Sequence, residues 1–332
     1  MDGSARSAFP TGLRTTPRDE LLDLSRAYVL ARAIHVAAEL GVADHVDANP
    51  VTAGEIARLT GARAPQLERL LRFLSGHRIF AEARPGAFVA TPMSNVLKTD
   101  APDSLRPALR MVNAAWWAAV GHLDHAVKTG ESAFADLHGQ PFFTWLKEHG
   151  DAQERFDAGM ANTSRTSDEA IARAYDFSRA PVVVDVGGGR GGLLRAILER
   201  HPSVRGVLFE QTQVVAAVRA PAAASIAARF EARAGDVFER VPDGGRIYVI
   251  KGVLHDFDDE KALVALRNCR RALADDGRLL VIERLLAGDD RPHQAKTIDV
   301  LMMALLGGRE RALAEWEHLF ESAGVGPPTR IQ

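Results

Sequence analysis

The stretch Val182–Leu194 reads VVVDVGGGRGGLL and decides the fold of the second half of the chain. A short apolar run passes through an acidic residue into a glycine-rich turn, and an apolar segment typical of a helix follows. Glycine has no Cβ and tolerates positive φ, so such a turn lets the backbone approach a nucleotide-like ligand closely. The stretch therefore predicts a buried strand, a ligand-binding turn and a helix.

Two carboxylates indicate the charge of that ligand. Gly187, Gly189 and Gly192 satisfy G-x-G-x-x-G, and Glu210 ends the next apolar run, where a carboxylate can bind ribose hydroxyls. These features fit NAD as well as S-adenosylmethionine (SAM). Asp185 lies two residues before the first glycine, where it would repel a pyrophosphate and attract an ammonium or sulfonium group. A cationic ligand is the better fit, with a nicotinamide dehydrogenase and a turn that binds nothing as alternatives.

Composition is that of an ordinary globular protein. The 332 residues are 46% hydrophobic and 25% charged, with a net charge of −2, which argues against a global electrostatic attraction to nucleic acid or anionic membrane. Cys269 is the single cysteine, so disulfides and cysteine-based zinc sites are excluded, and the eleven histidines show no spacing typical of metal ligands. Met1–Glu20 lacks the apolar core of a signal peptide, and no apolar run reaches membrane-spanning length. We expect a cytoplasmic protein without a metal.

Residues 1–100 have the pattern of a winged helix-turn-helix. Apolar residues from Leu30 to Leu40 predict a helix that Gly41 ends. Thr52 and Glu55 form a capping box before a second helix, and a third begins near Pro65 and ends at Gly76. Two short apolar runs, 79–81 and 87–89, then flank a turn like a hairpin.

This motif raises the alternative of a DNA-binding regulator. Residues 51–80 carry five arginines against two glutamates, and the helix near Pro65 exposes Arg69 and Arg72. Against this reading, the chain has no basic arm or tail and continues into a large α/β half. We therefore expect a packing or dimerisation module that binds no nucleic acid, since a fold alone does not determine function.

Residues 101–178 are expected to be helical and to cover a substrate pocket. The segment holds three of the four tryptophans, and a flat apolar substrate would need such walls, although aromatic clusters and methionine stripes are more often plain core. The candidates for substrate contact, two of them from a later helix, are Trp117, Phe143, Phe156, Met160, Asn162, Asp299 and Met303.

In residues 179–332, strands alternate with helices at regular intervals. The expected strands are 182–186, 207–210, a short segment before Asp236, 247–250 and 279–283, with a helix at 262–273. This alternation predicts an α/β fold with a Rossmann-like doubly wound parallel sheet, whose ligands bind beyond the carboxyl ends of the strands. Polar side chains that fall at or just after these ends are Asp185, Glu210, Asp236, His255 and Glu283.

Several motifs in this order together resemble the SAM-dependent O-methyltransferases of the plant caffeate and bacterial polyketide type. The resemblance covers nearly the whole chain, winged N-terminal domain included. The motifs that carry it are Asp185-Val186-Gly187-Gly188-Gly189-Arg190-Gly191, Gly235-Asp236-Val237-Phe238, Lys251, His255-Asp256-Phe257-Asp258-Asp259-Glu260 and Gly307-Gly308-Arg309-Glu310-Arg311.

The resemblance implies SAM as the cofactor, a homodimer formed through the N-terminal domain, and residue roles. His255 would be the general base, oriented by Glu283 and Glu310. Cofactor contacts would come from Gly187 in the loop, Glu210 at the ribose, Asp236 and Val237 at the adenine, Lys251, and Ser164 at the carboxylate end. Asp185 and Gly189 join this set from the charge and loop arguments above.

The chemistry gives an independent reason for a histidine. A phenol has a pKa near 10, so its oxygen attacks a sulfonium methyl poorly unless a base removes the proton, and an imidazole titrates in a suitable range. Simpler readings stay open: Asp256 or Asp258 would cap the next helix beside His255, and Glu310 lies among arginines as in a solvated charge run.

We expect an O-methyltransferase acting on a phenolic hydroxyl of a small aromatic, polyketide-like metabolite in natural-product biosynthesis. The alternatives are an N-methylating or non-methylating relative, or the winged-helix regulator. The chain departs from the resemblance at one point: relatives continue past Ser322-Ala323-Gly324 into two further strands, whereas this sequence ends at Gln332. We therefore expect a short sheet edge or a truncated chain.

Overall fold

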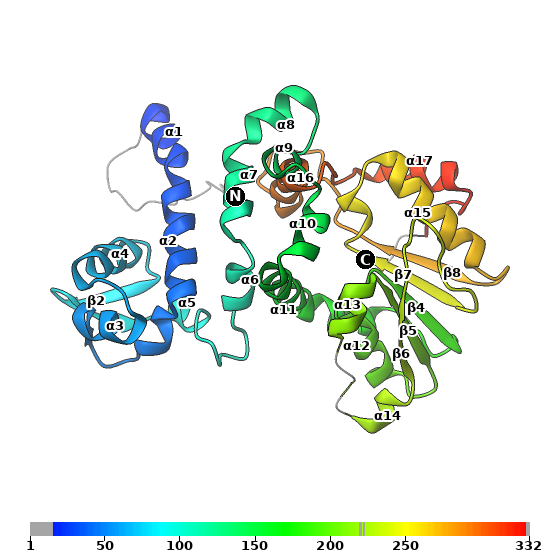
Figure 1. Cartoon of the computed structure of the whole chain (residues 1–332), viewed down its shortest axis with the longest axis horizontal. Coiled ribbons are helices and arrows are strands. Elements are labelled where there is room, and N and C mark those ends of the chain that lie inside the picture. The colour runs from blue at the N-terminus through cyan, green and yellow to red at the C-terminus, as the bar shows by residue number, and fades with distance from the viewer. Residues whose placement is uncertain (1–15, 219–220, 222, 330–332) are drawn as a thin grey trace, which may run out of the picture. The chain divides into compact units, whose positions relative to one another are not determined.

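The computed structural model describes residues 16–218, 221 and 223–329, and the chain divides into two compact units, 1–112 and 113–332 (Figure 1). The first unit contains, in chain order, α1 (Pro17–Ser25), α2 (Ala27–Leu40), the 3-10 helix η1 (Val42–His45), β1 (Val51–Thr52), α3 (Ala53–Thr60), α4 (Ala64–Gly76), β2 (Phe80–Arg84), β3 (Ala87–Ala90), α5 (Pro92–Asn95) and α6 (Arg106–Arg110).

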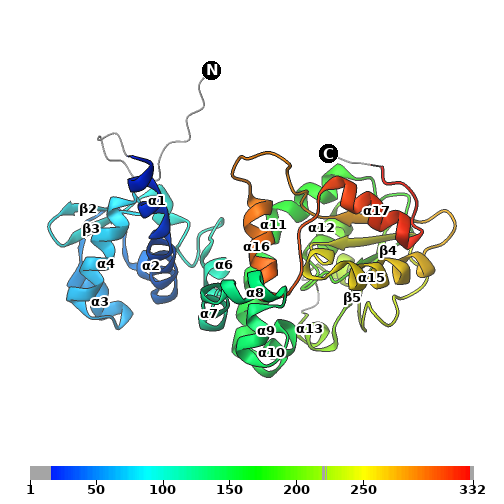
Figure 2. The ribbon, with the colours of Figure 1, turned by 90° about the horizontal axis from the view of Figure 1, so that it is seen from above.

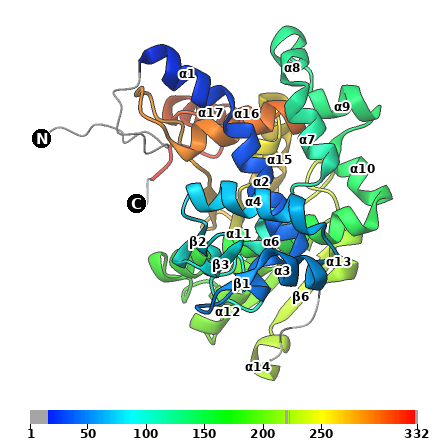
Figure 3. The same cartoon turned by 90° about the vertical axis from the view of Figure 1, so that its left-hand side faces the viewer.

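Local sequence signals account for the elements of this unit. Gly41 takes the left-handed conformation that ends α2, at φ 66°. The capping box that starts α3 is present: the amide of Glu55 donates to Oγ1 of Thr52 at 3.3 Å, and the amide of Thr52 donates to Oε2 of Glu55 at 2.9 Å. The three strands form an antiparallel sheet in the order β1-β3-β2 beside α3 and α4 (Figure 3). The expected winged-helix arrangement is confirmed.

The core of the first unit lies under α4 and the hairpin. Leu67, Leu71 and Leu74 are buried on one face of α4, and Phe80 and Phe88 are fully buried in the sheet. Arg69 and Arg72 are both exposed, as expected, and Arg72 is paired within the unit to Glu68 at 2.5 Å and to Glu82 at 3.6 Å.

The second unit alternates helices and strands after a helical segment. It contains α7 (Ala114–Gly121), α8 (Leu123–Thr129), α9 (Ala133–His138), α10 (Phe142–Glu148), α11 (Gly150–Ala174), β4 (Val182–Val186), α12 (Gly192–Arg200), β5 (Arg205–Glu210), α13 (Thr212–Ala217), α14 (Ala224–Ala227), β6 (Phe230–Ala234), β7 (Ile247–Lys251), η2 (Leu254–Asp256), α15 (Asp259–Ala272), β8 (Arg278–Ile282), α16 (Gln294–Leu305) and α17 (Leu313–Ala323).

The described strands β4–β8 form one parallel sheet in the order β6-β5-β4-β7-β8. In its centre, Val184 of β4 pairs with Val207 of β5 on one side and Tyr248 of β7 on the other. The reversal of strand order at β4 places the topological switch point, where such sheets bind ligands, beside the glycine-rich loop. The doubly wound α/β fold is confirmed. The expectation about the C-terminal edge concerns the chain after Gly324. Residues 325–329 form no strand, so β8 is the edge of the described sheet on that side, and 330–332 lie outside the described residues.

Helices cover both faces of this sheet (Figures 1 and 2). On one face, Trp316 and Leu319 of α17 pack with Leu266 and Cys269 of α15 against the sheet. On the other face, α12 packs on the sheet and the long helix α11 packs on α12. Within the described ranges, α11 included, no helix combines the length and apolar character that a membrane span requires.

Candidate active site

A cavity of about 430 Å³ lies beyond the carboxyl ends of β4, β5, β6 and β7. Parallel strands end at a common edge, so residues far apart in the sequence meet there. The cavity brings together all eight residues expected to contact the cofactor: Ser164, Asp185, Gly187, Gly189, Glu210, Asp236, Val237 and Lys251.

The loop between β4 and α12 depends on glycine at two positions. Gly187 and Gly189 have φ of 70° and 56°, in the left-handed region that side chains disfavour. A Cβ on Gly187 would lie 2.7 Å from Cγ2 of Val253, closer than such atoms pack. The loop can therefore approach Val253 closely only because Gly187 lacks a side chain, whereas Gly189 is required by its backbone conformation alone.

Glu210, the last residue of β5, is tied to this loop. Its Oε1 accepts a hydrogen bond from the amide of Gly189 at 3.3 Å, and its Oε2 accepts one from the amide of Gln211 at 2.5 Å. Burial raises the pKa of Glu210, and the two amide donors oppose that shift. The carboxylate is thus fixed at the cavity wall and keeps lone pairs that can accept hydrogen bonds from a pair of ribose hydroxyls.

The floor of the cavity contains more acidic than basic groups. Asp185 is 1% exposed, and its burial followed by the charge of Asp168 raises its pKa to about 7, while Lys251 opposes the shift. Nζ of Lys251 lies 2.5 Å from Oδ1 of Asp168, whose own pKa is raised by burial. One ammonium group therefore faces two buried carboxyl groups, and a cationic ligand would stabilise both as carboxylates. This arrangement fits the ammonium and sulfonium groups of SAM.

The opposite wall suits a flat ring. Oδ1 of Asp236 accepts from the amide of Phe238 at 2.8 Å, and Nδ2 of Asn268 donates to the carbonyl of Val237 at 2.6 Å, so the loop after β6 is held from two sides. Phe238 and Phe257 line the cavity with their rings edge to face, 4.9 Å between centroids. An adenine could lie against this wall.

His255 lies on η2, directly after β7, within a cluster of three carboxyl groups. Its Nδ1 is 3.0 Å from Oε1 of Glu310 and 3.7 Å from Oε2 of Glu283, and its Nε2 is 3.3 Å from Oδ1 of Asp256. Glu283 follows β8 directly, and its Oε1 accepts from the amides of Val253 and Leu254 at 3.0 and 2.8 Å. The three catalytic residues expected from the sequence are thus brought together.

The charges of this cluster control its protonation. Burial alone would lower the pKa of His255, but the hydrogen bond to Glu310 and the charges of Asp256, Glu283 and Glu310 outweigh burial and raise the pKa to about 9. Burial raises the pKa of Asp256 to about 7, and His255 opposes that shift. Without a ligand, the cluster therefore holds a proton on the imidazole at neutral pH.

The segment that carries Glu310 also holds the backbone of η2. The amide of Arg309 donates to the carbonyl of His255 at 2.9 Å, and Oδ1 of Asp299 accepts from the amide of Glu310 at 2.8 Å. Arg311 is fully buried, and its guanidinium donates to the carbonyls of Leu254 and Phe257 at 3.0 and 2.9 Å. Glu310 is therefore buried and positioned rather than part of a solvated charge run.

The structure separates the two aspartates beside His255. Asp258 is the N-cap of α15, because its Oδ1 accepts from the amide of Lys261 at 2.8 Å. Asp256 instead lines the cavity. His255 is 7% exposed and is not among the residues that line the cavity; its Nε2 lies behind the carboxyl group of Asp256.

The residues expected to contact substrate divide into two groups. Phe143, Phe156 and Met160 line the cavity. Outside it lie Trp117 on α7, Asn162 on α11, and Asp299 and Met303 on α16. Asp299 has a definite role in the fold, since it holds the amide of Glu310.

Asp168 and Asp256 are among the cavity residues that were not predicted from the sequence. Asp168 lies four residues after Ser164 on α11, so both fall on one face of the helix, and that spacing could have identified it. Asp256 was considered only as a helix cap. Its position in the cavity depends on the conformation of η2, for which the sequence carries no signal.

Comparisons with known proteins agree with this geometry. The model of an O-methyltransferase domain matches residues 120–326, and the model of an O-methyltransferase dimerisation domain matches residues 22–100. The chain is 38% identical to phenazine O-methyltransferase PhzM of Lysobacter antibioticus over 305 residues, 92% of this chain and 89% of that protein. It is also 38% identical to the mitomycin biosynthesis 6-O-methyltransferase of Streptomyces lavendulae over 319 residues, 95% and 91% of the two chains.

A solved structure is similar as well. The O-methyltransferase NcsB1 from neocarzinostatin biosynthesis, in complex with S-adenosyl-L-homocysteine (SAH) and 1,4-dihydroxy-2-naphthoic acid, superposes with a TM-score of 0.79 at 34% identity. The match covers 89% of this chain and 90% of that chain.

Proposed function

This chain belongs to the SAM-dependent O-methyltransferases that carry an N-terminal dimerisation domain, and we propose that it methylates a phenolic hydroxyl of a small aromatic metabolite in natural-product biosynthesis, with His255 as the general base. The observation that carries this proposal is the contact between His255 and Glu310 directly behind a cavity whose floor is acidic. The relatives named above act in phenazine and mitomycin chemistry, which supports an aromatic acceptor.

The residues of the cavity would hold the donor by charge. SAM supplies an electrophilic methyl group on a sulfonium. Asp185 and Asp168 would face the cationic end, and Glu210 would accept hydrogen bonds from the ribose. The loop Gly187–Arg190 would bring backbone amides close to the ligand. Fixing the donor in this way supplies orientation, which is worth several kcal/mol of a bimolecular barrier.

The proton would pass from the acceptor hydroxyl to Nε2 of His255. Asp256 lines the cavity with its Oδ1 3.3 Å from Nε2, so its carboxyl group has to relay that proton or turn aside. Nδ1 is held by Glu310 at 3.0 Å, which fixes the tautomer with its proton on Nδ1 and leaves Nε2 as the basic atom. Once Nε2 has taken the proton, Glu310 and Glu283 stabilise the imidazolium. A cationic donor in the cavity disfavours that charge, so it lowers the pKa of His255 and assists formation of the neutral base.

Aromatic side chains near the donor site support a flat acceptor. Phe143 and Phe156 line the cavity with ring centroids 6.0 Å apart in an edge-to-face arrangement, and Met160 lies on the same helix as Phe156. Such walls bind an aromatic ring through its apolar faces. The dimerisation domain supports a homodimer as the working form.

The proposal is tested by incubating the protein with methyl-labelled SAM and a panel of phenols, hydroxynaphthoates and matched aromatic amines. Label on a hydroxyl oxygen, located by mass spectrometry of the product, is the expected result. Label only on amines would replace the proposal by N-methylation. Gel-shift titration with DNA across salt concentrations addresses the regulator alternative, because phosphate contacts would give a steep salt slope.

A further inference from the structure

Away from the cavity, His122, His125 and Asp136 form a second cluster of metal-ligating side chains. His122 lies at the junction of α7 and α8, His125 follows on α8, and Asp136 comes from α9. Each offers one ligand atom, and these atoms all lie within 4.8 Å of one another. We propose that His122, His125 and Asp136 bind a divalent transition-metal ion, with Zn²⁺ as the ion of best fit.

The distances within the cluster suit such an ion. Oδ2 of Asp136 lies 2.8 Å from Nε2 of His122 and 3.6 Å from Nδ1 of His125. Zn²⁺ binds imidazole nitrogen and carboxylate oxygen at about 2.0–2.2 Å, which places neighbouring ligand atoms of a tetrahedral site about 3.3 Å apart. The two distances bracket this value, and the ligand nitrogens of the two imidazoles lie within 4.8 Å of each other, so side-chain rotation would bring the three ligand atoms around one ion.

The two rings must turn to share one ion. His122 and His125 stack with 5.0 Å between centroids and 20° between their planes. Their in-plane lone pairs therefore run nearly parallel, and rotation of one imidazole about its side-chain torsions would make them converge. The second ring nitrogen of His122, Nδ1, lies 3.8 Å from Oδ1 of Asp124. A carboxylate hydrogen-bonded to the non-ligating nitrogen is the usual outer partner of a metal-bound histidine, and Asp124 would have to move closer to fill that role.

The backbone beneath the cluster is held in place. Ser132 caps α9 by accepting from the amide of Ala135 at 3.2 Å, and its hydroxyl donates to the carbonyl of Leu305 on α16 at 2.9 Å. The side chains of the three ligands are 34%, 19% and 45% exposed, which leaves room for water at an open coordination position. Two imidazoles favour Zn²⁺, Ni²⁺ or Cu²⁺ over Mg²⁺ or Ca²⁺, which prefer oxygen ligands.

The sequence predicted no metal because its histidines were compared with cysteine and paired-carboxylate spacings. His122 and His125 are three residues apart, and Asp136 joins them only because α9 folds back beside α8. A bound ion would cross-link these two short helices. Zinc should therefore raise the thermal stability of the protein, by an amount that grows with the logarithm of its free concentration above the Kd.

The test measures zinc binding to the tag-free, chelator-treated homodimer by calorimetry, with Co²⁺ substitution giving a visible absorption band as a second readout. The wild type and the control His318→Ala, an exposed histidine outside the cluster, should bind equally. His125→Ala and Asp136→Asn should each weaken zinc binding by more than about tenfold, since even loss of an outer partner costs that much. The double variant His122→Ala/His125→Ala should lose the band and the thermal shift while still binding SAH.

His255, Glu283 and Glu310 also place ligand atoms within 4.8 Å of one another and are the competing site. Glu310→Gln distinguishes the two, because it should leave binding at His122, His125 and Asp136 intact. Zinc affinity that survives the double variant, or that is abolished by Glu310→Gln alone, would overturn the proposal. So would a wild type that binds zinc no better than the double variant.

Discussion

Glu310 and His255 are 55 residues apart in the sequence, and Oε1 of Glu310 lies 3.0 Å from Nδ1 of His255. Both side chains are buried, and the amide of Arg309 holds the carbonyl of His255 at the same time. In the proposed mechanism the pair would act as one unit, in which the carboxylate orients the ring, fixes its tautomer and raises its proton affinity. The first prediction concerns that proton affinity.

Activity of the wild type should rise with pH until His255 loses its proton. Because the surrounding carboxylates raise the pKa of His255 to about 9, the imidazolium persists above neutral pH and the free protein is inactive in that form. Glu310→Gln removes the charged partner, so the acidic limb of the kcat/KM profile should move to lower pH by about one to two units. Maximal activity should fall in the same variant, because the ring is held less firmly.

The pH profiles of kcat/KM are measured for the wild type and for Glu310→Gln with the same acceptor. Ionisation of the acceptor hydroxyl then affects both profiles equally. Superimposable acidic limbs would mean that Glu310 does not govern the proton on His255. The variant Glu317→Gln, at an exposed position on α17, is the control that should leave the limb unchanged.

Glu210→Gln should weaken binding of SAH. The carboxylate is fixed at the cavity wall by the amides of Gly189 and Gln211, and an amide in its place is a weaker acceptor for two hydroxyls. Loss of hydrogen bonds to a charged group costs about 1.5–3 kcal/mol, or roughly 10- to 150-fold in affinity. Calorimetry with SAH measures this loss of affinity directly.

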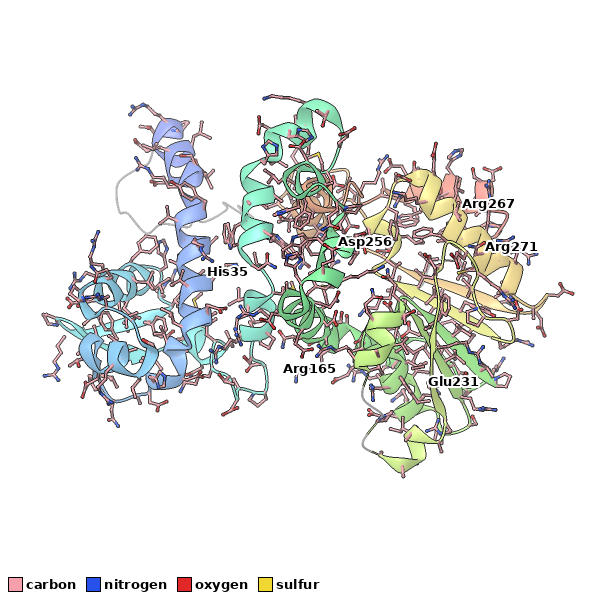
Figure 4. The ribbon with its side chains drawn as sticks, viewed as in Figure 1. His35, Arg165, Glu231, Asp256, Arg267 and Arg271 are labelled. Atoms are coloured by element: carbon pink, nitrogen blue, oxygen red, sulfur yellow. The ribbon has the colours of Figure 1, made fainter. Side chains whose placement is uncertain are left out.

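The control for Glu210→Gln is Glu231→Gln on the neighbouring strand, where the side chain of Glu231 pairs with Arg233 at the surface (Figure 4). This control should bind SAH like the wild type. Equal affinities of the two variants for SAH would remove Glu210 from the site.

Arg311→Met should lower stability and activity together. The buried guanidinium donates to two carbonyls of the His255 segment, pairs with Asp259 at 2.8 Å and lies 5.2 Å from the ring of Trp316. Removing one partner from such a network costs about 3–5 kcal/mol, because the buried carbonyls lose their donor. The urea-unfolding midpoint at fixed protein concentration should fall clearly. Arg309→Met is the matched control, since Arg309 is exposed, and a midpoint as low as that of Arg311→Met would refute the network argument.

Much of the fold could be predicted because its signals are local. The apolar run before Gly187 and the turn residues after each strand mark β4 and its neighbours, and the structure places β4, β5, β7 and β8 within about two residues of the expected bounds. The short strand β1 was not predicted, and β2 ends three residues beyond the run expected at 79–81. The capping box of Thr52 and Glu55 likewise depends on residues three apart. Alternating strands and helices leave few possible topologies, so a parallel sheet could be predicted from the sequence.

The detail of the site could not be predicted in the same way. In the 3-10 helix Leu254–Asp256, successive side chains point in directions about 120° apart, so a shift of one residue decides whether His255 or Asp256 reaches the cavity. Asp168 forms its ion pair with Lys251 across 83 residues of sequence, and no local pattern records that pairing. Contacts of this kind are fixed by packing between elements.

The most direct test of the account compares methyl transfer by the wild type, His255→Ala and the control His318→Ala, using labelled SAM and one phenolic acceptor under single-turnover conditions. The account predicts that His255→Ala binds SAH with unchanged affinity and transfers the methyl group about 10²- to 10⁴-fold more slowly, while His318→Ala behaves like the wild type. Transfer by His255→Ala at the wild-type rate would contradict it.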